Sequence, residues 1–184
     1  MGSYSAVVIR HDEDPKPVEE ALRALEGQGL VQRVPVRSQI NSGLLIGVDL
    51  TDRVFNEVPE TERYLLEIAR SSGLHVVLIL AVSSTDSFLY IHWLSGRILR
   101  ELGCGVDEQF QWTRVEGEPE DWEAEAFEGE EVVGADGQKR TLGRAADGHI
   151  ESPRPGDDSA PFAMRYAKCA LRHQTDDAFR GASG

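Results

Sequence analysis

The sequence contains few cysteines and no long apolar run. Its two cysteines, Cys104 and Cys169, are too few for the disulfide framework of a small secreted domain. The longest apolar run, Val76–Val82, is far shorter than the roughly 20 residues that a membrane-spanning helix needs. Residues 1–6 also lack the basic region and apolar stretch of a signal peptide. These absences predict a protein of the reducing cytoplasm.

Positive charge is also scarce in this chain. Its 184 residues include 19 lysines and arginines against 32 acidic residues, which gives a formal net charge of −13. Such a surface repels nucleic acid backbones and anionic membranes, so we expect neither as a partner. The hydrophobic fraction of 40% is sufficient for a core, and the length suits a single domain.

Catalytic and cofactor-binding motifs are missing as well. The sequence contains no Gly-x-Ser-x-Gly elbow, no His-Glu-x-x-His and no Cys-x-x-Cys. Gly27-x-Gly29 and Gly103-x-Gly105 each follow a predicted helix, whereas a dinucleotide-binding loop follows a strand and precedes a helix. The sequence therefore predicts no catalytic set, no cofactor and no metal ion.

Hydrophobic periodicity predicts strands and helices through about residue 115. We expect strands at 4–9, 30–36, 44–50, 74–82 and 109–115, and helices at 17–27, 60–71 and 84–102. Asp14 is the expected N-cap of the first helix. The third helix is expected because apolar residues such as Phe88, Ile91 and Ile98 recur at helical spacing.

This order of elements indicates an α+β fold with a mixed, partly antiparallel sheet and helices packed on it. The first six elements match a split β-α-β, or ferredoxin-like, core. We expect an α+β core over 1–115, an acidic loop and hairpin region over 116–158 and a C-terminal helix and tail over 159–184, all within one domain. The Asp136-Gly137 pair predicts the hairpin turn.

The acidity is concentrated in the segment Glu116–Glu131, which has nine acidic and no basic residues. One interpretation is a solvated loop, because like charges repel. The other is a docking surface for a basic protein, in which aromatic rings supply affinity and carboxylates steer association. On the second interpretation, the partner-binding residues are Glu118, Glu120, Asp121, Trp122, Glu123, Glu125 and Phe127.

Two other functions fit particular features of the sequence. His11 and Asp12 follow the first strand, and Ser84 lies between a predicted strand and a predicted helix. This placement suits a small-molecule enzyme with a site at the strand ends. A ferredoxin-like module that binds a regulatory ligand at a dimer interface is the other alternative.

One stretch resembles a known group of proteins. It reads Leu94-x-x-x-Ile98-Leu99-x-x-Leu102-Gly103-Cys104-Gly105-Val106-Asp107. This is similar to a helix that runs into Gly-Gly-x-[Ile/Val]-Asp in immunity proteins of bacterial toxin–antidote systems, with Cys104 in place of the second glycine. The chain shares their small size, acidity and lack of a catalytic set. The resemblance implies a non-enzymatic protein that neutralises a cognate toxin domain, typically a nuclease or other enzyme with a basic substrate groove.

Overall fold

The computed structural model describes residues 2–32, 35–40, 42–71, 73–105, 111–158 and 163–180. These residues form two compact units. Unit 1 takes the described residues within 1–4, 79–91 and 99–170, and unit 2 takes those within 5–78, 92–98 and 171–184. Each unit is described below by its own residues.

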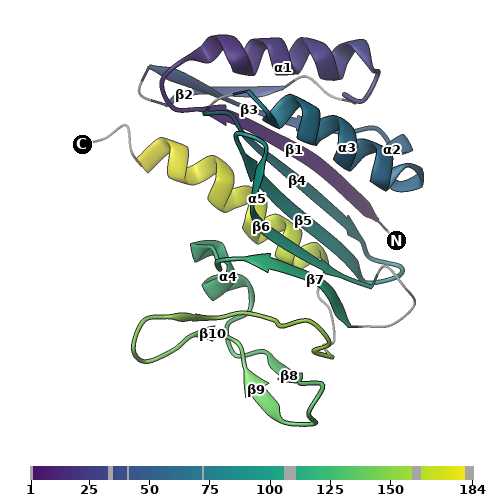
Figure 1. Ribbon diagram of the computed structural model, residues 1–184, viewed down its shortest axis with the longest axis vertical. Coiled ribbons are helices and arrows are strands. Elements are labelled where there is room, and N and C mark those ends of the chain that lie inside the picture. The colour runs from purple at the N-terminus through teal and green to yellow at the C-terminus, as the bar shows by residue number, and fades with distance from the viewer. Residues whose placement is uncertain are drawn as a thin grey trace. The chain divides into compact units, whose positions relative to one another are not determined.

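Seven strands form one sheet, in the order β2-β3-β1-β4-β5-β6-β7 (Figure 1). Their bounds are β1 Ser3–His11, β2 Val36–Ile40, β3 Gly43–Asp49, β4 His75–Val82, β5 Ser87–Leu94, β6 Arg97–Cys104 and β7 Trp112–Gly117. The pairs β1–β3, β2–β3 and β6–β7 are antiparallel. The α+β class is therefore confirmed, with a mostly antiparallel sheet. The strand expected at 30–36 is wrong for most of its range, because β2 shares only Val36 with it. Arg33 and Val34 lie outside the described residues.

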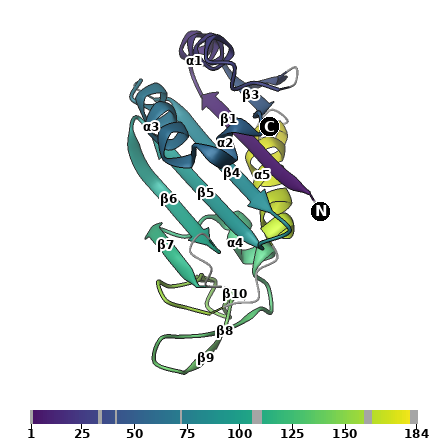
Figure 2. The same ribbon diagram turned by 90° about the vertical axis from the view of Figure 1, so that its right-hand side faces the viewer.

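The helices expected at 17–27 and 60–71 form in unit 2, and each begins two residues earlier than expected. In α1 (Pro15–Gly27), the Asp14 side chain accepts a hydrogen bond from the Lys16 amide, which caps the first turn. Its apolar stripe is buried, and α3 (Val58–Ala69) likewise buries Leu65 and Ala69. The short helix α2 (Arg53–Asn56) precedes α3. The Tyr64 hydroxyl donates to the Ala24 carbonyl at 2.8 Å, so α3 and α1 lie side by side (Figures 1 and 2).

The predicted helix over 84–102 is wrong, because these residues form strands β5 and β6. Ser95 and Gly96 connect them with positive φ angles of 50° and 75°. Positive φ at both central residues is the geometry of a tight hairpin turn. Aromatic and β-branched residues such as Phe88 and Ile91 favour strands, and burial on both faces of β5 produces the apolar spacing that also fits a helix.

The strand assignment also changes the environment of Cys104. This residue ends β6 instead of following a helix, and it is buried. Burial raises the pKa of its thiol to about 12, so at neutral pH it is a protonated, inert core residue. A β-bulge between Gly103 and Cys104 shifts the register of β6 against β7.

Residues 116–158 are largely ordered by short elements. They include α4 (Asp121–Ala126) and two small sheets. In one sheet, β8 (Glu131–Val133) pairs with β9 (Lys139–Thr141), which confirms the hairpin around Asp136-Gly137. In the other, β10 (Gly143–Arg144) pairs with β11 (Ile150–Glu151). The fully solvated loop interpretation of the acidic segment is therefore wrong for α4 and β8.

The last helix, α5 (Ala163–Arg180), follows this region. Residues 159–162, the start of the expected C-terminal helix and tail, lie outside the described residues. Within the described part of the chain, no helix has the length and apolar character required to cross a membrane.

Candidate functional site

The acidic segment forms a short helix whose start is fixed by its own glutamates. Glu120 is the N-cap of α4, and its amide donates to Glu123 Oε1 at 2.8 Å. This is the reciprocal arrangement of a capping box, with Glu120 at the cap and Glu123 three residues later. Asp121 and Glu123 add negative charge to the first turn, where the helix dipole favours it.

The inward face of α4 belongs to an aromatic core in unit 1. Trp122 and Phe127 are only 2% and 0% exposed. The Trp122 ring lies 5.9 Å from that of Phe127 and 4.9 Å from that of Tyr90. Phe127 also stacks edge-on against Trp112 and Tyr166, at 5.6 Å and 4.8 Å between ring centroids. Both aromatic residues that we expected to anchor a partner therefore stabilise this fold from within.

Glu123 is also buried, and its charge is balanced by Arg100 of β6. Arg100 Nε and Nη2 each donate to one Glu123 carboxylate oxygen at 2.8 Å. The two side chains are 2% and 0% exposed. The Ser152 hydroxyl donates to Glu123, and Arg100 Nη1 donates to the Gly117 carbonyl at 2.7 Å. A buried, hydrogen-bonded ion pair thus holds α4, β6 and the segment after β11 together.

Glu120 is half-buried and accepts two hydrogen bonds on the same oxygen. The Tyr90 hydroxyl donates to Glu120 Oε2 at 2.5 Å, and Trp122 Nε1 donates to it at 3.1 Å. Burial raises the pKa of Tyr90 well above its ordinary value, and the Glu120 charge raises it further. The phenol therefore stays protonated and serves as a hydrogen-bond donor to this carboxylate.

The remaining predicted carboxylates point outward. Asp121 and Glu125 are exposed and lie four residues apart, which places them on one face of α4. Glu118, before the helix, and Glu128, after it, are exposed as well. We call these four side chains, Glu118, Asp121, Glu125 and Glu128, the acidic surface.

Asp121, a member of the acidic surface, has a basic neighbour. Asp121 forms an exposed ion pair with Arg144 at 3.2 Å. Residues 111–158 carry 14 acidic and five basic residues, so unit 1 has a strong local excess of negative charge. Among the described residues, no hydrogen bond or ion pair involves the carboxylates of Glu118 and Glu128.

Of the residues of the alternative strand-end site, His11 and Asp12 belong to unit 2 and Ser84 belongs to unit 1. His11 ends β1, and Gly73 lies against its imidazole, so close that a Cβ on Gly73 would come within 2.6 Å of Nε2. Ser84 instead follows β4 in the turn before β5, where the neighbouring Ser83 amide donates to the Gly2 carbonyl.

Local hydrogen bonds and an ion pair engage the polar residues after β1. His11 Nδ1 accepts from the amides of Glu13 and Asp14 at 3.2 Å and 2.9 Å. Asp14 caps α1, and Asp12 lies 3.2 Å from Arg10 Nε. Within the ranges that the structure describes, no group of three or more His, Cys, Asp or Glu residues is arranged to hold a metal ion.

Sequence reasoning missed Arg100 and Ser152 because their partner is distant. Arg100 lies 23 residues from Glu123, and Ser152 lies 29 residues from it. The available signal was Arg100 within the apolar pattern of 94–104. Because that segment was interpreted as a helix, Arg100 was not recognised as a buried residue. The stretch that resembles immunity proteins likewise lies in β5, the turn and β6 up to Gly105, whereas Val106 and Asp107 are outside the described residues.

Comparison with models of protein families, with curated proteins and with solved structures finds no match for this chain.

Proposed function

We propose that this chain is a non-enzymatic binding protein that attaches to a basic protein partner through the acidic surface. The observation that carries the proposal is that α4 has one buried face and one exposed, acidic face. Its inward side chains, Trp122, Glu123 and Phe127, are held in the core of unit 1. Its outward side chains, Asp121 and Glu125, are carboxylates that solvent reaches.

A fixed array of carboxylates suits recognition of a positively charged groove. Negative potential accelerates encounter with such a groove and disfavours partners of the same sign. The buried Arg100–Glu123 pair and the aromatic core hold the backbone of α4, so less ordering entropy is lost on binding. The aromatic rings are unavailable for contact in this fold, so charge carries a large share of recognition.

The partner that best fits this chemistry is a toxin domain whose substrate groove binds phosphates. The acidic surface would occupy that groove and block its substrate, as the resemblance to immunity proteins implies. This function places the protein in the cytoplasm and requires no cofactor, nucleic acid or membrane. It would act by steric and electrostatic exclusion instead of by turnover.

We also propose that β1 to β4 form a split β-α-β core, as expected for a ferredoxin-like arrangement. α1 connects β1 to β2, and β3 lies between these two strands in the sheet order. The antiparallel pairs β1–β3 and β2–β3 support this topology. The acidic surface lies after β7, beyond this core in the sequence.

The proposal is tested by capturing partners from a lysate of the native host with the immobilised protein. The acidic surface is neutralised in the variant E118Q/D121N/E125Q/E128Q. The matched control, E13Q/E20Q/E26Q/D52N, removes the same number of exposed charges from unit 2. Captured proteins are identified by mass spectrometry, and the association rate of each purified partner is measured at several salt concentrations.

We expect a basic partner that the wild type and the control capture and the acidic-surface variant does not. We also expect the variant to associate at least about tenfold more slowly, with weaker salt dependence. Inhibition of that partner's enzymatic activity by the wild type would support the toxin assignment. Equal association rates for the variant and the control would remove the acidic surface from the interface.

A further inference from the structure

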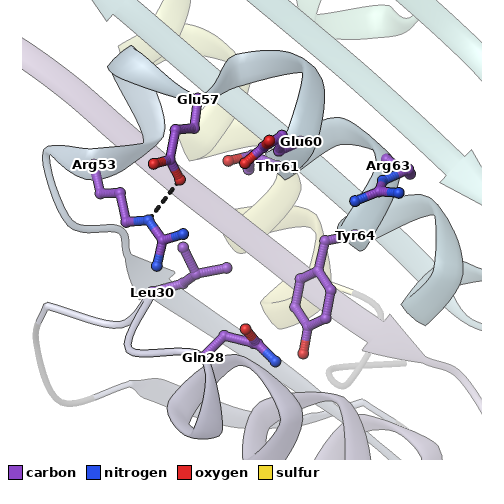
Figure 3. A pocket seen from close by; sticks show the side chains of 8 residues that line it. All are labelled: Gln28, Leu30, Arg53, Glu57, Glu60, Thr61, Arg63 and Tyr64. Carbon is purple, nitrogen blue, oxygen red and sulfur yellow. Dashed lines mark hydrogen bonds and ion pairs between the residues drawn. The ribbon is translucent and has the colours of Figure 1, made fainter.

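A hollow in unit 2 has the lining of a small-ligand site. It lies between the end of α1 and the corner where α2 meets α3, and its volume is about 230 Å³ (Figure 3). Gln28 follows α1, Arg53 belongs to α2, and Thr61 and Tyr64 belong to α3. Sites for drug-sized ligands measure roughly 300–1,000 Å³, so this hollow suits a smaller molecule.

Hydrogen bonds between elements hold the walls of the hollow. The Tyr64 hydroxyl donates to the Ala24 carbonyl at 2.8 Å, which joins α3 to α1. Arg53 Nε donates to Glu57 Oε2 at 2.6 Å, which joins α2 to the residue before α3. Gly29, with a φ of 66°, turns the chain after α1 so that Leu30 enters the lining. The cavity is therefore formed before any ligand arrives.

The lining carries balanced charges, unlike the acidic surface of unit 1. Two guanidinium groups, from Arg53 and Arg63, and two carboxylates, from Glu57 and Glu60, surround the hollow. Arg53 and Glu57 pair with each other. In the described part of the chain, no ion pair engages the side chains of Arg63 and Glu60. One cationic and one anionic group are thus available to a ligand.

A hydroxyl in the wall adds a neutral polar group to the lining. Thr61 is only 4% exposed and lines the hollow. Its amide donates to the Glu57 carbonyl at 2.9 Å. Within the described ranges its hydroxyl oxygen is not among the fully buried atoms without a partner, so a ligand in the hollow would replace water at this hydroxyl.

We propose that this hollow binds a free L-α-amino acid. The ligand carboxylate pairs with the Arg63 guanidinium and accepts from the Thr61 hydroxyl, and its ammonium group pairs with Glu60. Leu30 and the Tyr64 ring offer an apolar wall to the side chain of the ligand. A zwitterion fits this lining better than a simple anion or cation, because the two available groups have opposite charge. This site is independent of the acidic surface.

The test is calorimetric titration of the full chain with each of the twenty L-amino acids at millimolar concentrations. We expect at least one to bind, and we expect its N-acetyl and carboxamide derivatives to bind at least tenfold more weakly because each loses one charge. R63Q should weaken binding by a similar factor, and T61A by a smaller one. R23Q, which removes an exposed arginine of α1 outside the lining, is the matched control and should bind like the wild type.

Several results would overturn the proposal. These are binding of none of the twenty amino acids, equal binding of the blocked derivatives, or equal affinity in R63Q and R23Q. The blocked derivatives test the charge requirement on the unaltered protein, so the conclusion stands even if a variant folds poorly. Partner capture through the acidic surface is measured separately, and its failure would leave this result unaffected.

Discussion

At the scale of single residues, the feature of unit 1 that leads to a prediction is the buried ion pair Arg100–Glu123. Replacing Arg100 by methionine would leave the Glu123 carboxylate buried without its counter-charge. We therefore expect R100M to lower the free energy of unfolding by about 3–5 kcal/mol, measured by urea denaturation. R70M breaks the Arg70–Glu67 pair, whose side chains are 61% and 57% exposed, and should cost less than about 1 kcal/mol.

A double variant distinguishes the effect of the unpaired charge from the effect of altered packing. R100M/E123L removes both charges, and we expect it to be more stable than R100M because no uncompensated carboxylate remains. A loss in R100M no larger than in R70M would contradict the role assigned to the pair.

His149 offers a pH-dependent prediction at the same scale. Hydrogen bonds to Glu151 and then to Asp147 raise the pKa of this histidine above its ordinary value of 6.5. A raised folded-state pKa contributes stability that is fully present below about pH 6.5 and is lost as the pH rises through the folded value. An NMR titration of the His149 ring should therefore give a midpoint above 6.5.

The two acidic neighbours supply the matched variants for that titration. D147N and E151Q should each lower the midpoint of His149, whereas D136N, which alters an exposed turn between β8 and β9, should leave it unchanged. The pKa values of Asp147 and Glu151 are themselves lowered, chiefly by His149, so their contribution is lost as the pH falls. Identical midpoints in all three variants would exclude these hydrogen bonds in solution.

At the scale of elements, the Ser95-Gly96 turn determines that 87–104 is a hairpin. Gly96 has a φ of 75°, and a Cβ there would lie 2.9 Å from Arg70 Cγ. We expect G96A to destabilise the protein by about 1–2 kcal/mol, because a side chain is strained at this φ. G27A, at the end of α1 with open space around it, should be neutral or stabilising. Thermal unfolding of both variants makes the comparison, and equal melting temperatures would refute the turn geometry.

The hairpin also explains which elements sequence reasoning could predict. α1 was predictable because its cap and apolar stripe are local signals, and β4 because it is a continuous apolar run. β5 was not, because a strand buried on both faces loses its alternation and then fits a helical period. The Ser95-Gly96 pair was the available evidence against a helix. It indicates a hairpin turn only when the residues on its two sides are known to pair as strands.

At the scale of the whole molecule, the net charge of −13 predicts self-repulsion that salt relieves. We expect the melting temperature to rise as NaCl increases from about 10 mM to about 150 mM, since the Debye length falls from about 30 Å to about 8 Å. E125Q/E128Q should melt higher at low salt and respond less to salt, because these carboxylates lie near the unfavourable C-terminal end of the α4 dipole.

A variant that removes a positive charge provides the control for this prediction. K139Q removes an exposed cation that lies 3.6 Å from Glu131, so it should increase the dependence of the melting temperature on salt. If all three proteins respond to NaCl in the same way, the excess negative charge has no measurable effect on stability.

The sequence by itself determined the α+β class, the caps and turns that depend on neighbouring residues, and the position of the acidic segment. These features follow from local spacing and composition. Tertiary structure alone decided that Trp122, Glu123 and Phe127 face inward while Asp121 and Glu125 face solvent. The reason is physical: a side chain is buried only where a distant partner accepts its surface or its charge, and the partner of the α4 residue Glu123 lies on strand β6, 23 residues away.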